Sequence, residues 1–95
     1  GANMGAECAV FEPVHGSAPK YTGKDVANPT AEILSAVLML KHLGETDAAE
    51  RILASVRAVI GEGAQVTYDI KRSNTGSTEG SVGTQAYADA IIARL

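Results

Sequence analysis

The apolar residues between Thr30 and Leu43 cover most of the circumference of a helix. A helix that is apolar nearly all round is usually buried on several sides, so we expect this segment to lie in the core. Asn28 and Pro29 precede it as the N-cap and the first helical residue. Gly44 follows it as a natural C-cap.

Two further segments repeat apolar residues at intervals of three and four, as amphipathic helices do. Asp47 and Glu50 fit a capping box at the start of the first segment, and Gly61 and Gly63 end it. Thr84 is the expected N-cap of the second segment. The apolar stripes are Ala49, Ile52, Leu53, Val56 and Ile60 in the first, and Tyr87, Ala88, Ile91, Ile92 and Leu95 in the second.

Two short segments have the character of strands. Residues 7–11 form a short apolar run bounded by Gly5 and Pro13, which predicts a buried strand of about five residues. Cys8 lies in this run, so we expect it to be a buried thiol. Residues 65–69 are a second, shorter candidate for extended structure.

Residues 73–83 are too polar to be buried and predict a loop. The segment superficially resembles a phosphate cradle, but it lacks the Gly-Lys-Ser/Thr ending of a P-loop, so we interpret it as a connector. The elements together predict an α/β fold with short strands, three main helices and one long loop. With 95 residues the chain forms at most one domain.

The long loop, residues 12–29, contains all three prolines of the chain and cannot form a regular helix or strand. A long irregular segment in a compact domain is usually functional or disordered. His15, Ser17, Lys20 and Tyr21 offer cations and hydroxyls there, with few competing acids. The loop therefore predicts an anion site, most plausibly for a phosphate.

Composition narrows the functional classes. The net charge of −3 argues against a general nucleic-acid binder, whose surface would be strongly basic. The longest apolar run is too short to span a bilayer, so no membrane partner is expected. The single cysteine excludes an internal disulfide framework and suits a reducing compartment. We expect a soluble, cytoplasmic protein.

Several motifs resemble the isocitrate/isopropylmalate dehydrogenase family over essentially the whole chain. They are residues 15–23 (His-Gly-Ser-Ala-Pro-Lys-Tyr-Thr-Gly), Asn28-Pro29, residues 33–36 (Ile-Leu-Ser-Ala), the opening residues 1–5 and the closing residues 88–92. The resemblance corresponds to the C-terminal quarter of such an enzyme. It implies that residues 1–95 are the C-terminal, cofactor-binding segment of a larger dehydrogenase, although a natural one-domain protein remains an alternative.

By resemblance to the NADP-dependent members of this family, Lys20, Tyr21, Tyr68 and Arg72 surround the 2′-phosphate of the adenosine ribose. The chemistry agrees with this, because a lysine supplies a point charge, an arginine a two-pronged donor and two phenols neutral donors. Relatives that use NAD typically carry an acid followed by an aliphatic residue where this chain has Lys20-Tyr21. The resemblance therefore favours NADP over NAD.

The same resemblance implies further cofactor contacts. His15 and Asn28 correspond to positions that contact adenosine, although Asn28 is also the expected helix cap. Glu12 matches a carboxylate near the nicotinamide end, and a buried, hydrogen-bonded acid is the alternative. The remaining positions of the expected cofactor site are Gly16, Ser17, Ala18, Pro19 and Ala27.

The reaction implied by the family is the oxidative decarboxylation of isocitrate to 2-oxoglutarate, with hydride passing to NADP and Mg²⁺ or Mn²⁺ as Lewis acid. The resemblance places the metal ligands and the acid–base groups outside these residues, so we expect this segment alone to be inactive. The intact enzyme is expected to be a homodimer. The alternatives are a related decarboxylase for isopropylmalate or homoisocitrate, and a stand-alone, non-catalytic nucleotide-binding module.

Overall fold

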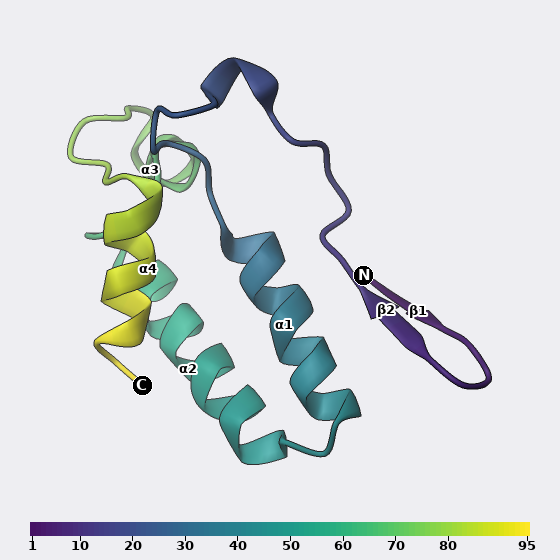
Figure 1. Ribbon diagram of the computed structural model, residues 1–95. Helices are drawn as coiled ribbons and strands as arrows, with labels where there is room; N and C mark the ends of the chain where they lie inside the picture. Colours follow the sequence, from purple (N-terminus) through teal and green to yellow (C-terminus); the bar gives the residue numbers. More distant parts are fainter.

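The computed structural model describes residues 1–95 and shows a bundle of helices beside a small β-hairpin (Figure 1). The strands are β1 (Ala2–Met4) and β2 (Ala9–Phe11), and the helices are α1 (Thr30–His42), α2 (Thr46–Glu62), α3 (Tyr68–Thr75) and α4 (Thr84–Ile92). A short 3-10 helix, η1 (Pro19–Tyr21), lies within the long loop. None of the helices is both long and apolar enough to cross a membrane.

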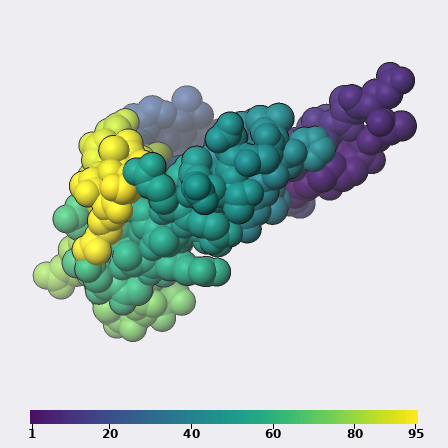
Figure 2. Space-filling view, turned by 90° about the horizontal axis from the view of Figure 1, so that it is seen from below, coloured from purple at the N-terminus to yellow at the C-terminus, as the bar shows by residue number.

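The hairpin extends away from the helices at one end of the molecule (Figures 1 and 2). Its two strands pair antiparallel, with Ala2 opposite Phe11 and Met4 opposite Ala9. The prediction of a buried strand over residues 7–11 was wrong in extent and in burial, since Val10 is 51% exposed. The prediction of a buried Cys8 thiol was also wrong, because Cys8 lies exposed at the hairpin turn, where nothing packs over it.

Helices α1 and α2 lie side by side and run antiparallel (Figure 1). Only Ser35 and Val37 of α1 are buried, whereas Leu34, Leu38 and Met39 are 36–41% exposed. The prediction that α1 is buried on several sides was therefore wrong for these 95 residues. The physical reason is that α1 packs against α2 and β2, and these two elements cover only part of its apolar circumference.

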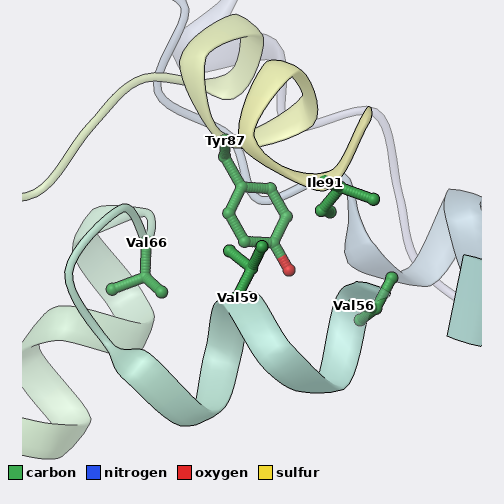
Figure 3. Packing of buried hydrophobic residues seen from close by; sticks show 5 residues of the cluster. All are labelled: Val56, Val59, Val66, Tyr87 and Ile91. Atoms are coloured by element: carbon green, nitrogen blue, oxygen red, sulfur yellow. The ribbon is translucent and has the colours of Figure 1, made fainter. Parts of the chain in front are cut away.

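The core lies where α4 crosses α2 (Figure 3). The ring of Tyr87 extends from α4 toward Val59 of α2, and Tyr87 is fully buried. The other core residues are Val56, Val66 and Ile91, with Ile33, Ile52, Ile60 and Ile70 packed around them. The predicted apolar stripes of the second and last helices are thus the faces that meet, except that Ile92 and Leu95 are exposed.

Helix α3 was not predicted. Residues 65–69 were a candidate for extended structure, but the helix begins at Tyr68 and ends at Thr75, inside the beginning of the expected connector. Val66 and Thr67 are fully buried, and Thr67 is the N-cap with extended backbone. The β-branched and aromatic residues resembled a strand, yet burial of Val66 fixes the chain there and a helix starts directly after it. The fold therefore has four helices rather than three, and the connector is residues 76–83.

Three helix starts differ from the prediction. Pro29 rather than Asn28 is the N-cap residue of α1, although the Asn28 carboxamide oxygen still accepts from the Thr30 amide at 2.9 Å. At α2 no side chain caps the helix, and the expected capping residue Glu50 pairs instead with Lys41 at 3.3 Å. At α4 the N-cap is Gly83 rather than Thr84.

Candidate functional site

The long loop arches from the hairpin over the start of α1 toward α3 (Figure 1). Asn28 holds its C-terminal end, because the Asn28 side-chain amide donates to Asp69 Oδ2 at 2.9 Å. The other carboxylate oxygen of Asp69 accepts from the Thr67 hydroxyl at 2.6 Å. These bonds attach the loop to the first turn of α3.

The Asp69 carboxylate is held in its ionised form by these contacts. Partial burial, the largest single influence, raises the pKa of Asp69. The hydrogen bonds from Thr67, Asn28 and the backbone amides of Asp69 and Ile70 together outweigh burial and lower the pKa below its ordinary value. A negative charge in the first turn also suits the dipole of α3.

Asp25 attaches the loop to a second helix, α4. Its backbone carbonyl accepts from the Thr84 amide at 3.1 Å, and its Oδ1 accepts from the Gln85 amide at 3.0 Å. The Thr84 hydroxyl donates to the carbonyl of Ala27 at 2.5 Å. Asp25 thus serves as the missing cap of α4, satisfying two amides at a helix N-terminus where a carboxylate is favourable.

The attached loop and α3 enclose a first concavity of about 590 Å³, which we call the loop hollow. Its walls come from both sides of η1 and from the start of α3. The lining residues are His15, Gly16, Ser17, Ala18, Tyr21, Ala27, Asn28, Tyr68 and Asp69. Ala18 has a left-handed backbone with φ of 48°, an uncommon conformation for a residue with a Cβ atom and one that tends to occur at ligand sites.

A second concavity of about 320 Å³, the α3 hollow, lies on the other side of the two phenols. It is lined by Tyr21, Val26, Tyr68, Arg72, Thr78 and Ser81. The Tyr21 and Tyr68 rings line both hollows, with their centroids 6.1 Å apart. The α3 hollow therefore contains one guanidinium, two phenols and two aliphatic hydroxyls, and its lining includes no carboxylate.

Two cations lie against the phenol pair. Lys20 Nζ is 5.1 Å from the centroid of the Tyr21 ring, and Arg72 Cζ is 5.6 Å from that of Tyr68. Interaction with the Tyr68 hydroxyl, followed by the charge of Lys20, lowers the pKa of Tyr21. The same hydroxyl interaction raises the pKa of Tyr68. The two phenols therefore differ in acidity, with Tyr21 the more acidic, and both lie near the positive charge of Arg72.

The structure brings most of the predicted residues together. Eight of them line the loop hollow, and Arg72 joins Tyr21 and Tyr68 in the α3 hollow. Pro19, Lys20 and Glu12 line neither hollow. Lys20 lies against the Tyr21 ring. Glu12 is exposed directly after β2, so the alternative that Glu12 is a buried acid was wrong for this chain.

Sequence reasoning missed Asp69, Thr78 and Ser81, which the structure adds to the two hollows. For Asp69 a signal existed, because an acid two residues after a threonine fits the first turn of a capped helix. For Thr78 and Ser81 the sequence carries no comparable signal, since they belong to a polar segment interpreted as a connector.

No group of three or more His, Cys, Asp or Glu side chains is arranged to hold a metal ion. The residues present therefore do not fit the divalent cation that the family resemblance implies, and we assign none of them to it. The two hollows, in contrast, fit an organic anion with an aromatic or sugar portion and a phosphate, because phenols, amide-bearing loops and a guanidinium converge there.

Comparison with known proteins gives a consistent result. The sequence profile of the isocitrate/isopropylmalate dehydrogenase family matches residues 1–91. The chain is 48% identical over 95 residues to a protein named isocitrate dehydrogenase [NADP] from Archaeoglobus fulgidus, covering all of this chain and 22% of that protein. It is 43% identical over 94 residues to isocitrate dehydrogenase [NAD] subunit 2, mitochondrial, from Kluyveromyces lactis, covering 99% of this chain and 24% of that protein.

Comparison of the structure with solved structures agrees with the sequence comparison. The crystal structure of isocitrate dehydrogenase from Methylococcus capsulatus superposes with a TM-score of 0.89 and 46% identity, covering 98% of this chain and 26% of that one. The hairpin, the loop and the four helices therefore have a counterpart in a solved α/β enzyme. The chain spans between a fifth and about a quarter of the length of these relatives.

Proposed function

The chain belongs to the isocitrate/isopropylmalate dehydrogenase family, and we propose that it supplies the NADP-binding site of an isocitrate dehydrogenase. The observation that carries this proposal is the α3 hollow. Tyr21 from the loop and Tyr68 and Arg72 from α3 converge there without a lining carboxylate. A phosphate monoester fits this set, since it is an anion with several acceptor oxygens.

The expected strength of the hydrogen bonds from Arg72 favours a ligand with a 2′-phosphate over one without it. A guanidinium can donate two parallel hydrogen bonds to phosphate oxygens, and each charge-assisted bond contributes about 1.5–3 kcal/mol. Two such bonds correspond to a preference of about a hundredfold or more. Lys20 Nζ lies 5.1 Å from the centroid of the Tyr21 ring but lines neither hollow, so its effect is expected to be smaller than that of Arg72.

The loop hollow would then hold the adenosine itself. Its backbone-rich wall at Gly16, Ser17 and Ala18 allows close approach, and the shared Tyr21 and Tyr68 rings border both the adenosine and the phosphate. NAD would need a free acid to accept from the ribose hydroxyls. The lining of the α3 hollow includes no acid that could do so, which supports NADP over NAD.

Further elements of the proposal concern the complete enzyme. Isocitrate as the substrate, oxidative decarboxylation to 2-oxoglutarate, and a homodimer are proposed from the family relationship, because the chain spans only 22% of the A. fulgidus relative. NADP, when bound, would supply the hydride acceptor for this chemistry. The role proposed for these 95 residues is to bind and orient its adenosine half.

The test is a comparison of kcat/KM for NADP and NAD in the complete enzyme, before and after Arg72→Ala. We expect kcat/KM for NADP to fall about a hundredfold or more, because Arg72→Ala removes both charge-assisted bonds, and kcat/KM for NAD to stay unchanged. Arg57→Ala, which removes an exposed arginine from α2, is the matched control and should change neither value.

An equal loss with both cofactors would contradict the proposed site and would indicate that Arg72 acts in folding. The same assay, run with isocitrate, isopropylmalate and homoisocitrate, identifies the substrate. Turnover of only one of the other two acids would contradict the isocitrate assignment. Absence of turnover with all three, together with retained NADP binding, would favour a non-catalytic nucleotide-binding module.

A further inference from the structure

The polar segment between α3 and α4 forms a defined turn rather than a simple connector. The Ser81 amide donates to the Thr78 carbonyl at 3.1 Å, and Gly80 between them has φ of 80°. This is the arrangement of a type II turn, in which the third residue needs a positive φ and glycine provides it. The turn brings its first and fourth residues, Thr78 and Ser81, close together.

The turn is held in place from both sides. The Val82 amide donates to the carbonyl of Val66 at 2.9 Å, and Val66 is fully buried. Lys71 donates to the carbonyl of Gly63 at 2.9 Å, while its side-chain stem packs beside Gly80. Ser81 is therefore the last residue of a turn that packs on Lys71 of α3, and the next residue, Val82, is hydrogen-bonded to the buried Val66. The fold thus fixes the position of Ser81.

Other hydroxyls of this segment are used to shape it. The Thr75 hydroxyl donates to the carbonyl of Lys71 at 2.9 Å, and the Ser77 hydroxyl accepts from the Glu79 amide at 3.1 Å. Thr78 and Ser81, in contrast, line the α3 hollow beside Arg72. Two residues that carry hydroxyls thus line the same concavity as Arg72, one exposed at the turn and one half-buried.

We propose that Thr78 and Ser81 are specificity-determining residues, whose hydroxyls donate to the phosphate monoester held by Arg72 in the α3 hollow. This rests on the proposed function and extends it to a wall of the site that neither the sequence nor the family resemblance assigned. A phosphate monoester offers more acceptor positions than one guanidinium can fill. The two hydroxyls would supply further donors in the hollow that Arg72 lines. Because hydrogen bonds to a charged phosphate are stronger than those to a neutral hydroxyl, they would favour a bound phosphate over a free ribose hydroxyl.

The inference is tested by calorimetric titration of the protein with 2′,5′-ADP and with 5′-AMP, two probes that differ only in the 2′-phosphate. We expect Ser81→Ala and Thr78→Val each to weaken 2′,5′-ADP binding about tenfold, the lower end of the range for a hydrogen bond to a charged group. Binding of 5′-AMP should not change. Thr78→Ser keeps the hydroxyl and should keep the affinity, and Ser73→Ala, which removes an exposed hydroxyl on α3 outside the hollow, is the matched control.

An Arg72→Ala arm separates the two proposals. If Arg72→Ala selectively weakens 2′,5′-ADP but Ser81→Ala and Thr78→Val do not, the role of the turn is overturned while the phosphate site stands. If Arg72→Ala has no selective effect either, both proposals fall. If Ser81→Ala and Thr78→Val weaken the binding of both probes equally, the inference is also overturned, because the two residues then have a structural role. Thr78 is exposed, so its Val and Ser variants keep the test valid even if the Ser81→Ala protein does not fold.

Discussion

The side-chain amide of Asn28 lies 2.9 Å from Asp69 Oδ2 and donates to it across 41 positions of sequence. The carboxamide oxygen of Asn28 also accepts from the Thr30 amide, and the Thr30 hydroxyl lies 2.7 Å from that of buried Tyr87. One connected set of hydrogen bonds therefore joins the long loop to α3, α1 and α4. The shape of the loop hollow depends on this set, because Asn28 and Asp69 are both part of its wall.

Replacing Asp69 with asparagine should destabilise the protein at neutral pH by about 0.5–1 kcal/mol, since it weakens two hydrogen bonds to a solvent-exposed carboxylate. The pKa of Asp69 is lowered in the folded protein. The contribution of the Asp69 carboxylate to the free energy of unfolding is therefore fully present above the pKa of about 3.9 in the unfolded chain. It is lost as the pH falls through the lower pKa of the folded protein. Urea unfolding from neutral pH to about pH 3 should show a smaller acid-induced loss of stability in Asp69→Asn than in the wild type.

Asp47→Asn is the matched control for that comparison. Asp47 also lies in the first turn of a helix, but no side chain caps α2. Its replacement should leave the pH dependence of the free energy of unfolding close to that of the wild type. If the two variants behave alike, the hydrogen bonds of Asp69 do not hold its charge and the set centred on Asn28 is not stabilising.

Substitution of Gly83 by alanine should displace the loop from α4. An added Cβ would lie 2.6 Å from the carbonyl oxygen of Asp25 and would also strike its carboxylate. Crowding of this kind costs about 1–3 kcal/mol. Gly61→Ala is the contrasting variant, because nothing lies near its Cβ position inside α2 and alanine favours helix. In thermal unfolding, the Tm should fall for Gly83→Ala and should stay unchanged or rise for Gly61→Ala. An unchanged Tm for Gly83→Ala would mean that Asp25 does not cap α4 in solution.

The phenol pair should titrate asymmetrically at alkaline pH. The Tyr68 hydroxyl, the main influence, and the charge of Lys20 both lower the pKa of Tyr21, while the pKa of Tyr68 is raised. Carbon-13 NMR of labelled tyrosines should therefore show Tyr21 ionising first. Tyr68→Phe and Lys20→Met should each raise the pKa of Tyr21, because each removes an interaction that lowers it. Coincident titration of the two phenols would show that their hydroxyls do not interact.

The helices that the sequence predicted best are those whose stripes meet each other. Residues of α2 and α4 carry apolar side chains at helical spacing, and the faces so defined form the core around Val59 and Tyr87. Helix α3 was missed because its start, Val66-Thr67-Tyr68, consists of residues that favour strands. What makes it a helix is tertiary, since Val66 and Thr67 are fully buried and the Thr67 hydroxyl donates to Asp69 in the first turn of the helix.

Burial was predicted less well than secondary structure, for a physical reason. The local pattern shows that α1 and Cys8 are apolar, but exposure depends on which elements pack over them, and here α2 and β2 cover only part of α1. The candidate site shows the same limit. Spacing alone could not place Arg72 and Tyr21 in one hollow, and the family resemblance supplied that expectation. The place of Ser81 in the same lining depends on the turn and on the hydrogen bond between Val82 and Val66, which the sequence does not show.

The central claim is that Tyr21, Tyr68 and Arg72 together recognise a 2′-phosphate. It is tested most directly by NMR, in which the wild-type protein is titrated separately with 2′,5′-ADP and 5′-AMP and the side-chain shifts are compared. We predict that the shifts specific to 2′,5′-ADP centre on the phenol rings and on the Arg72 guanidinium, with a smaller change at Lys20. Identical shift patterns for the two ligands, or shifts that leave Arg72 unmoved, would contradict the assignment.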